Sequence, residues 1–281
     1  METIGENSLW SVSNSGRLVR RTCFSIRKGD AYEIKNYMEL ATKIAALQFR
    51  NPDYVLLFRG QNRDHLRINR NGVRYTSLKP KLFRGVAEDY PSPVNLEHRF
   101  DRLREFERKL VMGYENEGYP GLNRLKRQQI LRWAILQHYE VCPTPLLDVT
   151  HSLRIAASFA SHEADTEAYV FALGVPNLSG AITASAEAGI QIVRLSSVCP
   201  PEALRPHLQE GYLLGEYPEM RDYDQKENYS NVEIDFGRRL IAKFRFDPRS
   251  FWEKSARFPQ VTKGALYPRK DPLNDLAESI K

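Results

Sequence analysis

Cysteine is scarce in this sequence, and long apolar runs are missing. The three cysteines, Cys23, Cys142 and Cys199, lie far apart and form no C-x-x-C pair. This spacing excludes a disulfide framework and a zinc ribbon, and it predicts reduced, mostly buried thiols. No apolar stretch approaches the ~18 to 20 residues that a membrane-spanning helix needs, and residues 1–30 lack the apolar core of a secretory signal. We therefore expect a cytoplasmic protein with no membrane partner.

Several motifs that identify an enzyme class are also absent. The sequence contains no H-E-x-x-H motif and no Cys/His ligand spacing, so we expect no metal site. It also contains no Walker loop, no G-x-G-x-x-G after a strand and no G-x-S-x-G elbow. These absences leave the corresponding nucleotide-binding and hydrolase classes without support.

The composition is that of a globular protein in which charge is unevenly distributed. The 281 residues are 42% hydrophobic and 27% charged, enough for one large domain or two ordinary ones. The net charge is +6, yet residues 59–84 contain eight basic side chains and one acid, whereas residues 210–235 contain eight acids and two basic side chains. The acidic block would repel a diffuse polyanion. A compact phosphate ligand in the basic segment is compatible with both blocks.

Periodicity predicts an α+β fold. Amphipathic spacing indicates helices at residues 35–49, 96–110, 124–138 and 151–161. Apolar or alternating runs indicate strands at residues 54–59, 168–173, 190–195, 211–214 and 238–246. Because helices gather in the first half and strands in the second, we expect a central mixed or antiparallel sheet and not a doubly wound one.

The sequence also suggests how the chain is divided. Residues 1–30 are expected to form an N-terminal arm or edge strands, and residues 31–281 the main domain, within which residues 84–135 are a helical insertion. Prolines and small polar residues predict an irregular stretch at 84–95. The acidic composition of 216–235 predicts a solvated loop or insertion.

The stretch VLLFRGQ is the first candidate for a binding motif. Val55 to Phe58 form an apolar run, as a central strand would, and Arg59 then stands at its end. An arginine at a strand end presents a planar fork of donors suited to phosphate or carboxylate. Gly60 allows a sharp turn or a close approach of the backbone to a ligand. The alternative is that Arg59 is paired with a nearby acid.

The second candidate motif runs from Leu136 to Ser161. A predicted helix ends at His138, a short apolar run follows, and Asp148, Thr150 and Ser152 then precede the next helix. Polar groups between a buried strand and a helix N-terminus suit anion binding, because free backbone N–H groups and the helix dipole point at the same place. Thr150 or Ser152 could instead be a plain N-cap.

Two residues of this motif, Asp148 and His138, can each be interpreted in two ways. Asp148 follows two leucines, so we expect it to be partly buried and either hydrogen-bonded or paired with a cation. His138 ends an apolar helix and is either a hydrogen-bonded structural residue or a group that carries a proton.

Five segments of the chain resemble successive signatures of the FRG domain family, which is named for its Phe-Arg-Gly motif. They are FRGQ at 58–61, LKPKLFR at 78–84, LQHYEVCPTPLLDVTHSLRIAASFA at 136–160, HLQEGYLL at 207–214 and ALYPRKDPLNDLAESI at 265–280. The resemblance covers Glu33 to Ile280, nearly the whole chain. It implies a bacterial or prophage protein, with phage defence as a possible setting.

This chain departs from the family at two positions. Family members often carry a glycine and an arginine where this sequence has Glu140 and Pro145. Loss of that arginine leaves Asp148 in need of another cation, and Arg59 is the candidate.

More distantly, the order of motifs resembles the mono-ADP-ribosyltransferases. The resemblance implies a split sheet, with NAD bound in turn by Arg59, by Thr150 or Ser152, and by Gln209 or Glu210. NAD would be the substrate, and a carboxylate near the ribose would stabilise the oxocarbenium ion that develops in the transition state. The transferases usually place a Glu or Gln two residues before the catalytic Glu, whereas Gln209 and Glu210 are adjacent here.

Two classes of function follow. The first is an ADP-ribosyltransferase or NAD glycohydrolase; its catalytic candidates are Glu210, Gln209 and His138, and its binding candidates are Arg59, Gly60, Gln61, Thr150, Ser152 and Asp148. The second is a non-catalytic effector module that docks nucleic acid or an acidic protein partner. RNA cleavage by His138 or His151 is a third hypothesis, but it lacks a second proton-transfer group. A cleft shared by Arg59, Thr150 and Glu210 would favour catalysis; a buried Arg59–Asp148 pair with Glu210 in solvent would favour the module.

Overall fold

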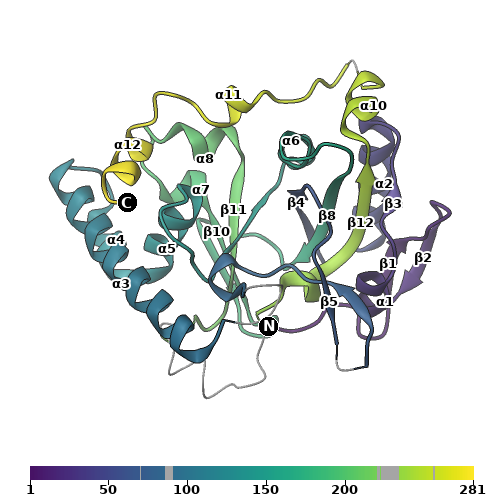
Figure 1. Cartoon of the computed structure of the whole chain (residues 1–281), viewed down its shortest axis with the longest axis horizontal. Helices are drawn as coiled ribbons and strands as arrows, with labels where there is room; N and C mark the ends of the chain where they lie inside the picture. Colours follow the sequence, from purple (N-terminus) through teal and green to yellow (C-terminus); the bar gives the residue numbers. More distant parts are fainter. Residues whose placement is uncertain (70, 86–90, 220–221, 223–233, 256) are drawn as a thin grey trace.

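A single large sheet organises the molecule (Figure 1). The computed structural model describes residues 1–69, 71–85, 91–219, 222, 234–255 and 257–281. Within this part of the chain, eight strands pair in the order β3-β12-β8-β4-β7-β11-β10-β9. In that order they are β3 (Tyr32–Glu33), β12 (Leu240–Phe246), β8 (Ala168–Val175), β4 (Val55–Gln61), β7 (Leu147–Thr150), β11 (Gly211–Glu216), β10 (Ile190–Arg194) and β9 (Ile182–Ser185).

The sheet is mixed, and its two halves meet at one residue pair. The pairing of β3 with β12 is parallel, and the other neighbours in the sheet are antiparallel. In the centre, β4 and β7 are paired only through Phe58 and Thr150, whereas β4 and β8 pair along the whole of β4. The predicted α+β fold with a central mixed sheet is confirmed.

The amphipathic helices lie close to where their periodicity predicts them. They are α2 (Tyr37–Arg50), α3 (Pro93–Asn116), α4 (Leu122–Arg127), α5 (Gln129–His138) and α6 (Leu153–His162). The helix expected at 124–138 is in fact two helices, because Gln128 between them has an extended backbone. Figure 1 shows α3, α4 and α5 beside the β10–β11 part of the sheet and α2 on the β12 side.

Strand β4 runs further than the sequence suggested. The expectation that it ends at Arg59 was wrong, because the pairing with β8 continues through Gly60 and Gln61. Gly60 is needed here because α6 lies directly against the strand: a Cβ on Gly60 would lie 1.9 Å from the carbonyl oxygen of Ala156. Arg59 therefore emerges from inside a strand, next to a close crossing of strand and helix.

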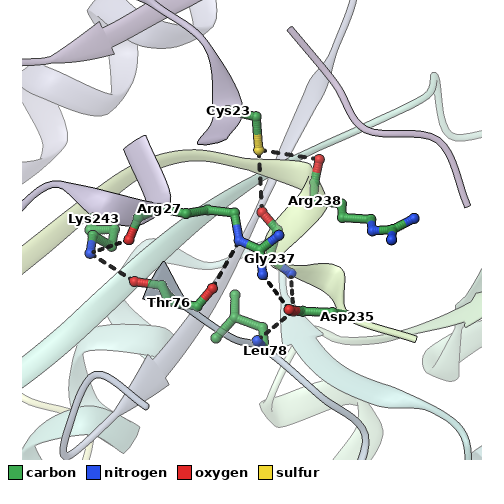
Figure 2. A network of polar contacts seen from close by, with 8 residues as sticks. All are labelled: Cys23, Arg27, Thr76, Leu78, Asp235, Gly237, Arg238 and Lys243. Carbon is green, nitrogen blue, oxygen red and sulfur yellow. Dashed lines mark hydrogen bonds and ion pairs between the residues drawn. The ribbon is translucent and has the colours of Figure 1, made fainter. Parts of the chain in front are cut away.

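Residues 1–30 fold against the main sheet. They form β1 (Leu9–Val12), β2 (Leu18–Arg21) and α1 (Cys23–Lys28), and α1 is tied to η3 (Phe236–Arg239) by the polar network of Figure 2. There Arg27 forms a buried ion pair with Asp235, and its Nε donates to the carbonyl oxygen of Thr76 over 2.9 Å. The Asp235 carboxylate also accepts from the backbone N–H of Leu78 over 2.8 Å. The network thus fixes the basic segment to α1.

Short elements complete the described chain. They are β5 (Leu66–Ile68), β6 (Arg74–Thr76), η1 (Lys81–Phe83), α7 (Leu195–Val198), α8 (Leu204–Leu208), α10 (Pro248–Glu253), α11 (Lys263–Leu266) and α12 (Pro272–Ser279). The three cysteines are unpaired and buried, as predicted. Of the stretches expected to be irregular, residues 86–90, 220–221 and 223–233 lie outside the described residues, and Pro93 already begins α3. In the described part of the chain no helix is both long and apolar enough to span a bilayer.

Candidate functional site

A polar cavity of about 250 Å³ lies where β4, β7 and β11 meet α5 and α6. Most of the residues singled out from the sequence line it, although they come from segments far apart in the chain. They are Arg59, Gly60 and Gln61 of β4, His138 of α5, Asp148 and Thr150 of β7, and Gln209, which lies two residues before β11. Ser152 and Glu210 do not line it.

Arg59 is held by a main-chain oxygen. Its Nη1 donates to the carbonyl of Asp148 over 2.6 Å, and its buried Nε makes no hydrogen bond within the described part of the chain. Burial lowers the pKa of Arg59, and the Asp148 carboxylate opposes this shift. The Asp148 carbonyl therefore fixes the guanidinium through Nη1, while the buried Nε–H donor is left for another partner.

The expected ion pair between Arg59 and the Asp148 carboxylate is not formed. The carboxylate instead accepts a hydrogen bond of 2.6 Å from the Gln137 side chain, whose oxygen accepts one from the Thr144 hydroxyl. Burial raises the pKa of Asp148, against the lowering effects of Arg59 and Gln137. The predicted pairing was wrong, and the alternative of a hydrogen-bonded Asp148 is confirmed. The partner of Arg59 is a backbone oxygen, which no residue type in the sequence reveals.

Thr150 uses its hydroxyl to join two strands. The hydroxyl donates to the carbonyl oxygens of Gln209 and Glu210, at 2.8 and 3.1 Å, and accepts from the N–H of Ser152 over 3.0 Å. Ser152 occupies the N-cap position of α6, but its side chain makes no capping hydrogen bond. Thr150 thus locks the end of β7 to the residues that precede β11.

Gln209 and Glu210 differ in where their side chains lie. Gln209 is buried, and its side-chain amide donates to the carbonyl oxygen of Leu266 over 2.8 Å. Glu210 is exposed, has a φ of 44° and lies outside the cavity lining. Of the two, only Gln209 lines the cavity. The cleft shared by Arg59, Thr150 and Glu210 that would favour catalysis is therefore not formed in this structure.

His138 and Arg205 form another wall. His138 is 4% exposed, and burial followed by the Arg205 charge lowers its pKa well below 6.5, so that its ring is uncharged at neutral pH. Arg205 forms an ion pair of 2.9 Å with Glu140 and lies over the ring of Tyr267, 4.5 Å from its centre. Arg205 and Tyr267 were not predicted as site residues. Tyr267 lies in the 265–280 segment that resembles the family, but the resemblance gave it no role, and Arg205 lies just before the 207–214 segment.

Among the described residues, four buried polar atoms of this lining have no hydrogen-bond partner. They are Arg59 Nε, Gln61 Oε1, His138 Nε2 and Arg205 Nε. Buried polar groups in folded proteins are normally satisfied by protein, ordered water or ligand. Their concentration around one cavity fits a polar ligand that offers both donors and acceptors.

Basic residues gather on one side of the cavity, whose lining also contains Glu140, Asp148 and Glu163. Arg84 lines it, and burial followed by the charge of Arg59 lowers its pKa to about 10. His65 lies beside it, and burial together with Arg63, Arg84 and Arg59 lowers its pKa to about 4. Burial is the first cause of both shifts, and the neighbouring positive charges add to it. Such a group of cations on one side of the cavity favours an anionic ligand there.

Comparison with known proteins bears on part of the chain. The family model described as the FRG domain matches residues 55–168, which include β4, α5, β7 and α6 but not Gln209 or Glu210. The resemblances at 207–214 and 265–280 lie outside this match and stay predictions. Among curated proteins and among solved structures, nothing matches the chain. Within the described residues, no group of three His, Cys, Asp or Glu side chains is placed to hold a metal ion. The segment that builds most of the cavity therefore identifies this chain as one that contains an FRG domain.

Proposed function

We propose that the cavity binds a nucleotide, and that NAD is its ligand. The observation that carries this proposal is the convergence of three neighbouring strands, β4, β7 and β11, which bring Arg59, Thr150 and Gln209 to one cavity. The same order of arginine, hydroxyl and glutamine or glutamate is the one implied by the resemblance to the mono-ADP-ribosyltransferases. The four unpartnered buried atoms supply the ligand contacts.

Each group has a role that follows from its charge and its remaining hydrogen-bonding capacity. Arg59, with Arg84 near it, holds a phosphate, because a guanidinium gives charge-assisted hydrogen bonds to phosphate oxygens. Gln61 Oε1 accepts from a ribose hydroxyl, and the uncharged His138 contributes Nε2 to a neutral part of the ligand. Thr150 and Asp148 hold the site together through the main-chain and side-chain bonds described above.

Cleavage of NAD, by transfer or by hydrolysis, is the second candidate function, and the backbone of Glu210 favours it. Glu210 has a left-handed φ of 44° directly after Gln209, and such conformations in non-glycine residues cluster at functional sites. Its carboxylate would need to turn into the cavity to stabilise the oxocarbenium ion. With this step the protein is a cytoplasmic effector enzyme, for which the FRG family resemblance suggests a role in phage defence.

Calorimetric titration of the full chain with NAD tests the binding proposal. We expect binding that Arg59→Gln weakens roughly 10- to 100-fold, the equivalent of a lost hydrogen bond to a charged group. Arg17→Gln is the matched control, because it removes an equal charge from an exposed turn between β1 and β2. Equal affinity of Arg59→Gln and wild type, or no NAD binding at all, would overturn the proposal. Release of nicotinamide during the same incubation reports the second candidate function.

A further inference from the structure

A second hollow, of about 420 Å³, adjoins the first cavity. The two share His65 and Arg84, and the second is also lined by Arg63, Arg67, Ser77 and Lys79. None of the described residues that line it is acidic. Small-molecule sites usually measure about 300 to 1,000 Å³, so the first cavity alone is small for a dinucleotide, and the second extends it.

The chain that forms one wall of the second hollow is fixed by the network of Figure 2. Thr76 is bonded to Arg27 through its carbonyl and to Lys243 through its hydroxyl, and Leu78 N–H is bonded to Asp235. Alternate residues of an extended chain point to opposite sides. Ser77 and Lys79 accordingly line the hollow while Thr76 and Leu78 face the core.

Ser77 provides an observation that does not depend on charge. The residue is 6% exposed, and its hydroxyl has no hydrogen-bond partner within the described part of the chain. A buried hydroxyl without a partner is uncommon in folded proteins. Its place among basic side chains matches the mixture of cations and hydroxyl groups that binds phosphate oxygens.

The residues shared by the two hollows lie near positive side chains of both. His65 is held uncharged by burial and by Arg63, Arg84 and Arg59, which come from both hollows. An anion beside these side chains would relieve their mutual repulsion.

We propose that the second hollow is a phosphate subsite and that the ligand extends through both hollows. This inference rests on the proposed nucleotide binding for the first cavity and deepens it. The ligand class is then a dinucleotide with a diphosphate bridge, such as NAD: one phosphorylated half occupies the cavity at Arg59, and the far phosphate lies among Arg63, Arg67 and Ser77. A mononucleotide would occupy only the first cavity.

The experiment uses inorganic pyrophosphate, NAD and nicotinamide mononucleotide as calorimetric probes of the full chain. We expect the double variant Arg63→Gln/Arg67→Gln to weaken pyrophosphate and NAD binding at least tenfold and to leave nicotinamide mononucleotide within twofold. Arg59→Gln should weaken NAD and nicotinamide mononucleotide. The variant Arg63→Lys/Arg67→Lys, which keeps the charge, should recover most of the pyrophosphate affinity.

The outcomes separate this inference from the proposed function. Pyrophosphate that does not bind, or that binds the double glutamine variant as tightly as wild type, overturns the second subsite whatever NAD does. A double variant that weakens nicotinamide mononucleotide as much as NAD also overturns it. If Arg59→Gln changes neither nucleotide while pyrophosphate binding follows the double variant, the nucleotide proposal for the first cavity fails and the anion site in the second hollow stands.

Discussion

Arg59 donates to the main-chain carbonyl of Asp148 over 2.6 Å, while the Asp148 carboxylate turns to the side chain of Gln137. The two charged residues are therefore linked without a direct ion pair. The carbonyl oxygen of Asp148 fixes the position of the Arg59 guanidinium but, being uncharged, does not neutralise its positive charge. An Arg59 of this kind can hold a phosphate, whereas a buried ion pair would have consumed its charge.

Asp148→Asn should make the free energy of unfolding less dependent on pH, so that stability falls less as pH rises. Because burial raises the pKa of Asp148 above that of the unfolded chain, the native state holds this proton more tightly, and stability falls as pH rises above about 4. Asparagine has no such proton and can still accept from Gln137. We expect the free energy of unfolding of Asp148→Asn, relative to wild type, to increase between pH 4 and pH 7.5 in urea titrations. The exposed Asp165→Asn is the control; a constant difference for Asp148→Asn would contradict the prediction.

Gly60→Ala should destabilise the fold strongly. A methyl group would lie 1.9 Å from the carbonyl oxygen of Ala156, and both the strand and the helix at this crossing are backbone that cannot move aside cheaply. We expect a loss of at least about 3 kcal/mol, at the upper end of overpacking effects, measured as a lowered unfolding midpoint in urea. Gly264→Ala is the control, since nothing lies within 4 Å of its added Cβ. Equal stability of the two variants would show that α6 can move away from β4.

The main elements of this fold could be predicted from the sequence because their periodicity is physical. Leu96, Phe100, Leu103 and Phe106 recur at helical spacing, and all are buried in α3. The alternation of Phe244 and Phe246 with Arg245 likewise marks β12. Elements such as β5 and β6 escaped prediction because three residues are too few to establish a period.

Site residues that stand in a recognisable sequence motif could be predicted. Residues that reach the cavity only through the tertiary fold, and main-chain hydrogen-bond acceptors, could not. Arg59, His138 and Asp148 stand in motifs that placed them at a common cavity. Arg205 and Tyr267 reach the same cavity from α8 and from a residue after α11, and no local pattern connects these segments to β4. The acceptor for Arg59 is a carbonyl, which every residue carries, so sequence alone favoured the carboxylate.

Asp235→Ala should destabilise the protein and also lower the affinity of the second hollow for pyrophosphate. Asp235 is 3% exposed, pairs with Arg27 and accepts from the N–H groups of Leu78 and Gly237. Removing one partner of a buried ion pair costs about 3 to 5 kcal/mol, because the other charge stays buried. We expect that loss in urea unfolding and weaker pyrophosphate binding at temperatures where the variant is folded. Glu278→Ala, which breaks an exposed pair with Lys281, should change neither measurement.

Nucleic acid should compete poorly with NAD. The basic residues of the candidate site line confined hollows, and the sequence carries eight acids between residues 210 and 235 that oppose a long polyanion. We expect single-stranded RNA to bind weakly and to lose its affinity as salt is raised, while NAD binding persists. Fluorescence anisotropy of labelled RNA across a salt series measures this. RNA that binds tightly at physiological salt and displaces NAD would favour the docking module instead.

Glu210→Gln should separate ligand binding from chemistry. The Glu210 side chain is exposed and outside the cavity lining, so we expect the variant to bind NAD within twofold of wild type. Gln209→Ala, by contrast, removes a buried lining residue that also bonds to Leu266, and it should weaken NAD roughly 3- to 10-fold. If the protein turns NAD over, nicotinamide release should disappear in Glu210→Gln while binding remains, because the carboxylate is needed only when positive charge develops on the ribose. A Glu210→Gln variant that releases nicotinamide at the wild-type rate would show that the Glu210 carboxylate takes no part in the cleavage of NAD.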